Sequence, residues 1–137
     1  MNPKEYKYTP EHEWICPESK GKGKVGLADY AQSQLGDIVF LDLSAPGTQV
    51  KQGKKIGEVE SVKAVSDIFA PVSGQVLEVN QTVIDEPGLV NKDPYGAGWL
   101  LRLELSKAPE LDALMDSDEY DKLIVQLSEE ESEQTED

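Results

Sequence analysis

The segment GEVESVKAVSDIFAP, residues 57–71, decides the fold of this chain. Two runs rich in β-branched residues, 56–60 and 65–69, flank the tetrapeptide that runs from Ser61 to Ala64. That spacing predicts a β-hairpin with a four-residue turn. Lys63 then lies at the tip, where another protein can reach its side chain. A lone exposed lysine is usually a solubilising charge, so the rest of the chain must decide between the two interpretations.

Further short strands are expected on both sides of this hairpin, over residues 11–16, 24–27, 38–43, 75–79 and 99–105. The run Ile38 to Leu43 is apolar on both faces, which predicts a central strand buried between two layers. Residues 99–105 alternate between apolar and polar side chains, as a half-buried strand does. Many short strands at close spacing indicate a mainly β fold, an antiparallel sandwich or flattened barrel with some helix.

Helical patterns occur at two places. Asp29 is expected to cap a short helix over residues 29–35, with Gly36 as its C-terminal stop. Near the C-terminus a short helical piece opens at Pro109, and Ser117 is expected to cap a second helix with apolar residues at helical spacing. Residues 1–127 are therefore predicted to form a single domain. The acidic stretch 128–137 has no apolar side chain to bury and is predicted to be a disordered tail.

Composition narrows the possible partners and compartments. The formal net charge of −14 and the pI near 4.4 argue against binding to nucleic acid or to anionic membranes. Cys16 is the only cysteine, so an intramolecular disulfide is impossible and a reducing compartment is expected. No apolar run reaches membrane length, and the N-terminus has neither signal nor transit character. We expect a cytoplasmic protein, or a mitochondrial matrix protein if a leader has been removed.

The residues available for catalysis are few. The chain has one histidine, His12, which is interpreted as structural, and it has no glycine-rich phosphate loop. No Cys/His spacing typical of a metal site is present either. A chain with so few catalytic groups and one displayed lysine suggests a monomeric carrier, not an enzyme, whose reactivity is added after translation.

The hairpin, followed by Ala70-Pro71-Val72-Ser73-Gly74, resembles the lipoyl-lysine segment of the glycine cleavage system H protein family. The resemblance extends to the block YTPEHEW at 8–14, to the block DYAQ at 29–32 with LGDIVF at 35–40, and to the blocks between 89 and 100. These blocks keep the family order and cover nearly the whole chain from Lys7 to Ile124. Only the extreme N-terminus and the acidic tail fall outside.

The resemblance implies a lipoyl/biotinyl-like sandwich that acts as a shuttle without catalysis of its own. Lipoate would be joined to Lys63, between Val62 and Ala64, by the lipoylating enzymes. The family carries an aminomethyl group from glycine decarboxylase to aminomethyltransferase and passes electrons to dihydrolipoamide dehydrogenase. By motif position, Glu13 and Asp67 would hold the carried amine as ammonium in a cleft.

Several alternative interpretations of the displayed lysine exist. Some family members have a histidine where this chain has Gln34, which leaves any pH gating through that position in doubt. Biotin carriers place methionines on both sides of their lysine, and lipoyl domains of 2-oxoacid dehydrogenases are smaller modules on flexible linkers. An amine nucleophile at Lys63 would need a desolvated lysine, which a hairpin tip does not provide. A lipoyl donor that relays the cofactor to 2-oxoacid dehydrogenase complexes remains the alternative function.

Overall fold

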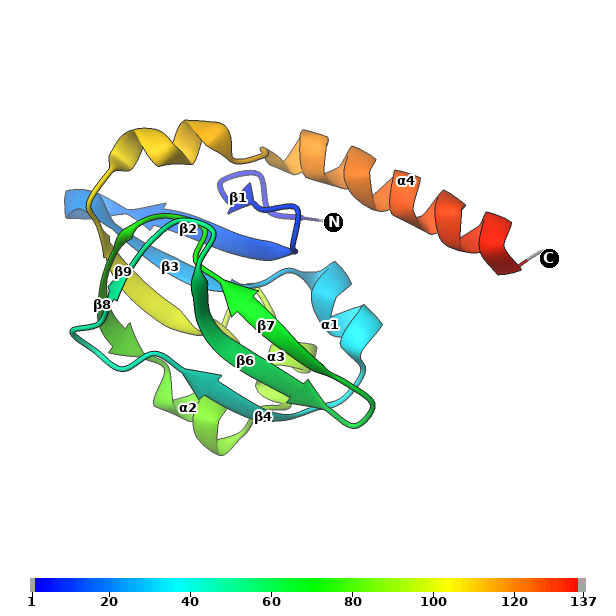
Figure 1. Ribbon diagram of the computed structural model, residues 1–137, viewed down its shortest axis with the longest axis horizontal. Coiled ribbons are helices and arrows are strands. Elements are labelled where there is room, and N and C mark those ends of the chain that lie inside the picture. The colour runs from blue at the N-terminus through cyan, green and yellow to red at the C-terminus, as the bar shows by residue number, and fades with distance from the viewer. Residues whose placement is uncertain (1, 136–137) are drawn as a thin grey trace.

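The computed structural model describes the chain from Asn2 to Thr135, and its side chains as far as Glu130. Its strands form two antiparallel sheets (Figure 1). The six-stranded sheet has the order β1 (Lys7–Tyr8), β2 (Glu13–Glu18), β3 (Lys22–Leu27), β9 (Leu101–Leu105), β8 (Gly74–Val79) and β5 (Gln49–Val50). The three-stranded sheet has the order β4 (Ile38–Leu43), β6 (Lys55–Ser61) and β7 (Val65–Phe69).

The main core is made of apolar side chains from both sheets. Ile15, Val25 and Leu103 come from the large sheet, and Val59 and Ile68 come from the small one. All five are at most 1% exposed. The alternation at residues 99–105 places Leu101 and Leu103 of β9 on the inward face of the large sheet. The predicted antiparallel sandwich is confirmed, and the two sheets do not close into a barrel.

Short helices connect some of the strands, and the longest helix follows the last strand. The helices are α1 (Asp29–Leu35), α2 (Gln81–Asp85), α3 (Leu89–Lys92) and α4 (Ser117–Thr135), with 3-10 turns η1 (Ser19–Gly21) and η2 (Ala108–Ala113). The helix expected at 29–35 has those bounds, but the N-cap position is Ala28 and Asp29 is its first helical residue. Gly36 ends α1 as predicted: its φ of 79° suits glycine, and its N–H donates to the Gln32 carbonyl.

The prediction of a central strand at Ile38–Leu43 was wrong, because β4 is an edge strand of the small sheet. Its pairing with β6 shifts register between Ile38 and Phe40, which leaves Val39 as an extra residue. This β-bulge turns two consecutive apolar side chains outward, where regular alternation would bury one of them. Val39 is 49% exposed and Phe40 is 55% exposed.

A second, aromatic core holds the C-terminal helix. Tyr8 and Tyr120 are fully buried and stack with ring centroids 4.6 Å apart. His12 Nδ1 lies 2.8 Å from the Tyr120 hydroxyl, and its ring also contacts Tyr30. Burial lowers the pKa of His12, so the neutral ring is favoured there. These contacts support the structural interpretation of His12 and fix the first turns of α4 to the domain.

Beyond these contacts α4 extends away from the sandwich (Figure 1). The segment expected to be a disordered tail has a helical backbone as far as Thr135, and residues 136–137 lie outside the described residues. Glutamate is a good helix former, and extending an existing helix costs much less than starting one. The division between a domain at 1–127 and a tail at 128–137 stays a prediction. No helix among the described residues is long and apolar enough to span a membrane.

Deleting residues 129–137 should therefore leave the melting temperature of the protein nearly unchanged. The deleted residues include no apolar side chain, so no core contact is lost. Thermal unfolding followed by circular dichroism at 222 nm would check this, with the full-length chain as reference. A fall of more than about 5 °C, roughly 1 kcal/mol for a domain of this size, would mean that the tail docks on the domain.

Candidate functional site

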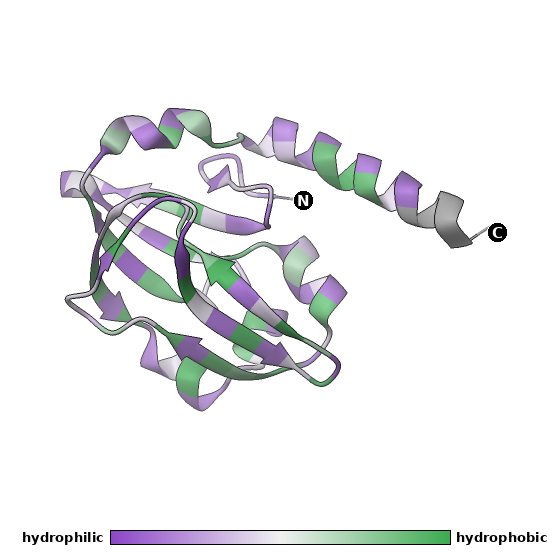
Figure 2. Cartoon of the chain, viewed as in Figure 1, coloured by the Kyte–Doolittle hydropathy of each residue, from purple (hydrophilic) through white to green (hydrophobic). Residues whose placement is uncertain are grey.

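The predicted hairpin is present with the expected turn. β6 and β7 pair from Lys55 opposite Phe69 to Glu60 opposite Val65, and residues 61–64 connect them. The Ser61 N–H donates to the Ala64 carbonyl at 2.8 Å and closes the turn. Ile56, Val59 and Ile68 are buried, and hydrophilic residues lie between the hydrophobic ones on both strands (Figure 2). One face of the hairpin is therefore buried against the large sheet, and the other is open to solvent.

Ser61 organises the turn from inside. Its side chain is buried, with 6% of the residue exposed, and its Oγ accepts hydrogen bonds from the N–H groups of Lys63 and Ala64. The Val62 N–H donates to the Asp37 carbonyl at 3.0 Å, which ties the turn to the residue before β4. The backbone that carries Lys63 is therefore held from both sides.

Replacing Ser61 with Ala should lower the free energy of unfolding by about 1 kcal/mol, because two N–H groups of the turn lose their acceptor. Denaturant unfolding would measure the change. Ser33 is the matched control, since its Oγ donates on the exposed surface of α1 and Ser33→Ala should change stability by less than about 0.5 kcal/mol. Equal effects of the two substitutions would contradict the role given to Ser61.

Lys63 itself is exposed at the tip. None of the ion pairs among the described residues involves its ammonium group. Its Cε lies 3.6 Å from the point where a Cβ would stand on Gly36, so the stem of the lysine passes beside the end of α1. Val62 and Ala64 on either side are also exposed. A side chain that is free in this way fits covalent attachment of a flexible group such as lipoate, which needs an accessible amine and a firm base.

Asp67 lies on the solvent-facing side of the small sheet. Its Oδ1 is 3.3 Å from Lys55 Nζ, and Lys55 also pairs with Glu58. All three side chains are close to half exposed. Exposed pairs of this kind contribute little to stability, so Asp67 is available for a ligand.

Glu13 is the buried carboxyl among the side chains that the structure describes. It is 1% exposed at the start of β2, where Oε1 accepts from the Thr9 hydroxyl at 2.6 Å and Oε2 accepts from the Phe69 N–H at 3.2 Å. Burial raises the pKa of Glu13 to about 7, although the hydrogen bonds from Thr9 and Phe69 oppose the shift. The residue can therefore gain or lose a proton near neutral pH.

A cavity of about 240 Å³ opens beside this carboxyl, with Phe69 and Ala70 also in its lining. The path along β7 from Val65 to Phe69 covers about 13 Å at the usual rise per residue. A long side-chain arm rooted at Lys63 could follow this path to Glu13. Asp67 lies on the same path, although no hydrogen bond or ion pair among the described residues links it to Glu13.

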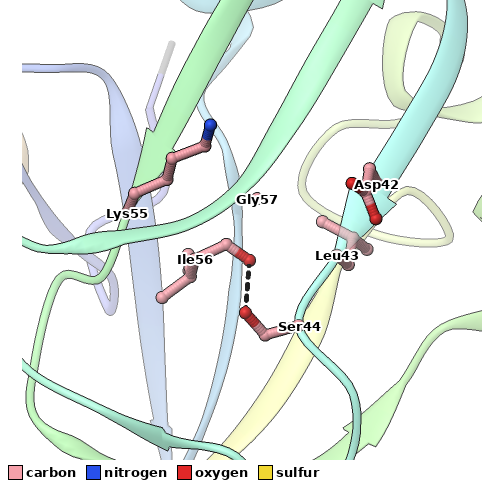
Figure 3. Close-up of a pocket in the computed structure, with 6 residues that line it drawn as sticks. All are labelled: Asp42, Leu43, Ser44, Lys55, Ile56 and Gly57. Carbon is pink, nitrogen blue, oxygen red and sulfur yellow. Dashed lines mark hydrogen bonds between the residues drawn. The ribbon is translucent and has the colours of Figure 1, made fainter.

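A second hollow, of about 300 Å³, lies at the open end of the hairpin (Figure 3). Lys55 and Asp42 stand on either side of it, and the Ser44 hydroxyl donates to the Ile56 carbonyl. The ammonium group of Lys55 in this lining already pairs with Glu58 and Asp67, and Asp42 is the acidic side chain opposite it.

Gln34, Cys16 and a possible metal site remain to be considered. Gln34 is exposed on α1. Cys16 is half-buried on β2, and burial raises the pKa of its thiol, which disfavours the reactive thiolate. Within the described part of the chain, no three His, Cys, Asp or Glu side chains are close enough together to hold a metal ion.

Comparison with known proteins agrees with this arrangement. Residues 6–127 match the family model described as glycine cleavage H-protein. The glycine cleavage system H protein of Carboxydothermus hydrogenoformans is 51% identical over 122 residues, covering 89% of this chain and 93% of that protein. Its counterpart in Burkholderia ambifaria is also 51% identical, covering 89% and 96%. The crystal structure of the Mycobacterium marinum glycine cleavage system H protein superposes with a TM-score of 0.78 at 39% identity, covering 87% of this chain and 95% of that one.

Proposed function

Because the chain belongs to the glycine cleavage H-protein family, we propose that it carries lipoate on Lys63 and has no catalytic activity of its own. Membership makes the chain a lipoylated shuttle protein of the glycine cleavage system, which works with the enzymes of that system. Family membership does not by itself identify the residue that carries lipoate, and we assign it to Lys63. The observation that carries it is the exposed Lys63 side chain on a hydrogen-bonded turn, without an ionic partner among the described residues.

The residues around Lys63 have separable tasks. Ser61 fixes the backbone from which the arm starts, and the hydrogen bond from the Val62 N–H to the Asp37 carbonyl limits movement of the turn. Bound lipoate supplies a disulfide that exchanges two electrons and sulfur atoms that can carry a group. Tethering at a fixed point raises the effective concentration of that group at each partner enzyme.

Glu13 and Asp67 are proposed to hold the amine that the family carries. A buried carboxylate beside a cation favours the charged ammonium, whose nitrogen then has no lone pair with which to expel a thiolate. Glu13 supports this proposal because it is buried beside a cavity lined by Phe69, about 13 Å along β7 from Val65. Asp67 supports it as a second, exposed carboxylate on the path between them.

The proposed partners are glycine decarboxylase, aminomethyltransferase, dihydrolipoamide dehydrogenase and the lipoylating enzymes. The acidic surface would attract basic docking sites on them, an effect that salt should weaken. We also propose that the chain is monomeric and works in the cytoplasm, as its bacterial relatives suggest.

Intact-mass measurement after incubation with a lipoylating enzyme and lipoate tests the attachment. We expect one lipoyl increment, located on the peptide that contains Lys63. Glycine-dependent formation of NADH with the other three components of the system then tests the shuttle. Transfer of lipoyl groups to apo 2-oxoacid dehydrogenase, without NADH formation from glycine, would instead favour the relay function.

A further inference from the structure

Exposed apolar side chains gather around the lysine. Five large hydrophobic residues are exposed in the part of the chain that the structure describes, and four of them belong to β4 or to the hairpin. They are Val39, Phe40, Val62 and Val65, which are 49%, 55%, 67% and 61% exposed. The fifth, Val125, lies on α4. Scattered exposed apolar residues are ordinary, but a cluster at one functional position indicates an interaction site.

Strand pairing places two members of this cluster in one row, with the exposed Glu60 between them. Phe40 on β4 pairs with Glu60 on β6, and Glu60 pairs with Val65 on β7. Paired residues point to the same face with Cβ atoms about 5 Å apart, so Phe40 and Val65 stand on either side of Glu60. Val62 and Lys63 follow one and two residues after β6 ends. The apolar row therefore lies at the base of any arm attached to Lys63.

The bulge in β4 makes this row possible. Regular alternation would bury either Val39 or Phe40, but the register shift after Ile38 leaves both exposed. Two exposed apolar residues on an edge strand are an aggregation hazard, which natural proteins usually avoid. Bulges often re-aim side chains next to functional sites. An exposed pair beside the modified lysine is therefore best explained by a partner that covers it.

The next row of the same face is acidic. Asp42 pairs with Glu58, and Glu58 pairs with Asp67, while Lys55 contacts the last two. A partner that fits this face needs an apolar surface for the first row and basic groups at the border toward the second.

Geometry distinguishes among the possible partners. Enzymes that act on the dithiolane meet the far end of the arm and can dock anywhere within its reach. An enzyme that forms the amide must bring an activated lipoyl group to Lys63 Nζ itself, so its active site has to enclose the hairpin tip. The surface at the base of the arm is therefore buried by the acylating enzyme in particular.

We propose that Val39, Phe40, Val62 and Val65 form the docking surface for the enzyme that acylates Lys63. This inference rests on the proposed attachment at Lys63. In the acylation, Nζ gives up its ammonium proton and attacks the carbonyl carbon of an activated lipoyl ester or anhydride. The leaving group departs with the electron pair of its bond to that carbon, and Nζ loses a second proton to give the amide. No oxidation or reduction takes place.

The test compares acylation of unmodified variants by a purified lipoylating enzyme, with free lipoate and ATP as the source of the activated acyl group. Phe40→Ser and Val65→Ser should each lower kcat/KM for the carrier protein at least tenfold, which corresponds to about 1.4 kcal/mol of lost transition-state binding. Val125→Ser is the matched control, because it removes an equally exposed valine far along the chain and should leave kcat/KM within twofold of the unsubstituted chain. Phe40→Leu should recover most of the loss, and thermal unfolding would show that all variants fold.

Each variant would then be fully acylated with excess enzyme and assayed as a substrate of dihydrolipoamide dehydrogenase. Rates within twofold of the unsubstituted protein are expected, because that enzyme acts at the far end of the arm. Acylation of Phe40→Ser and Val65→Ser at the rate of Val125→Ser would overturn the inference and leave the proposed function intact. Equal losses in acylation and in the dehydrogenase assay would also overturn it, because the surface would then serve enzymes in general. Failure of the unsubstituted chain to be acylated at all would overturn the proposed function and the inference together.

Discussion

Lys63→Arg is expected to abolish glycine cleavage supported by this chain while leaving its fold unchanged. Arginine keeps the positive charge, but its guanidinium stays protonated and is not a substrate for amide formation. The residue is exposed at a turn and has no ionic partner among the described residues, so stability should change by less than about 0.5 kcal/mol. Intact mass should show no lipoyl increment, and NADH formation from glycine should fall to the background without the carrier.

Lys54→Arg provides the control for this experiment. Lys54 is another exposed lysine, next to the turn at Gly53. Strand β6 separates it from the hairpin tip. The Lys54 variant should be lipoylated and active at the level of the unsubstituted chain. Retained glycine cleavage in Lys63→Arg would place the lipoyl group on another residue and refute the assignment.

The hairpin could be predicted because all of its determinants are local. The β-branched runs on each side and the four residues between them specify the strands, the turn and the position of Lys63. Gly36 was predictable for the same reason, since a glycine after an amphipathic stretch ends a helix. The family blocks extend these local signals to nearly the whole chain.

The place of β4 could not be predicted from its pattern. A strand that is apolar on both faces usually lies in the centre of a sheet, and here a bulge after Ile38 exposes Val39 and Phe40 at an edge. A bulge is decided by pairing with Ser61 and Glu60, residues about twenty positions away. The apolar residues at 38–43 indicate an apolar surface, but their pattern does not distinguish a surface in the core from a docking surface.

The burial of Glu13 could not be predicted from the sequence either. Its position in the motif suggested a role, but its environment depends on Phe69, which is 56 residues away and presents its N–H to the carboxyl. A sequence shows that a carboxyl is present and not whether water reaches it. The raised pKa of Glu13, to about 7, follows from burial that only the tertiary structure provides.

Glu13→Gln should therefore stabilise the empty protein at high pH and leave it unchanged at low pH. The folded-state pKa of Glu13, about 7, lies above its ordinary value of 4.5, so the folded chain binds more protons than the unfolded chain between these values. The free energy of unfolding of the unsubstituted protein consequently falls as pH rises through this window, and the loss is complete above pH 7. A shift of this size corresponds to about 3 kcal/mol, so the variant should be more stable by about 2–3 kcal/mol at pH 8 and equal at pH 4. Denaturant unfolding at both pH values checks this, with the exposed Glu86→Gln as the control that should show no such difference.

The same substitution should have the opposite effect on the loaded protein, and the two readouts together test why a buried acid is kept. If the carried amine lies beside Glu13 as ammonium, its charge offsets the cost of the buried carboxylate, and the glutamine variant loses that pairing. Release of formaldehyde from isolated aminomethylated protein at fixed pH and salt should then be faster in Glu13→Gln, about tenfold for each 1.4 kcal/mol of pairing lost. Asp67→Asn should accelerate release less, because its exposed carboxylate is screened by water and shared with Lys55. A variant that is more stable at pH 8 and yet releases formaldehyde at the unsubstituted rate would mean that Glu13 is a buried acid without contact to the carried amine.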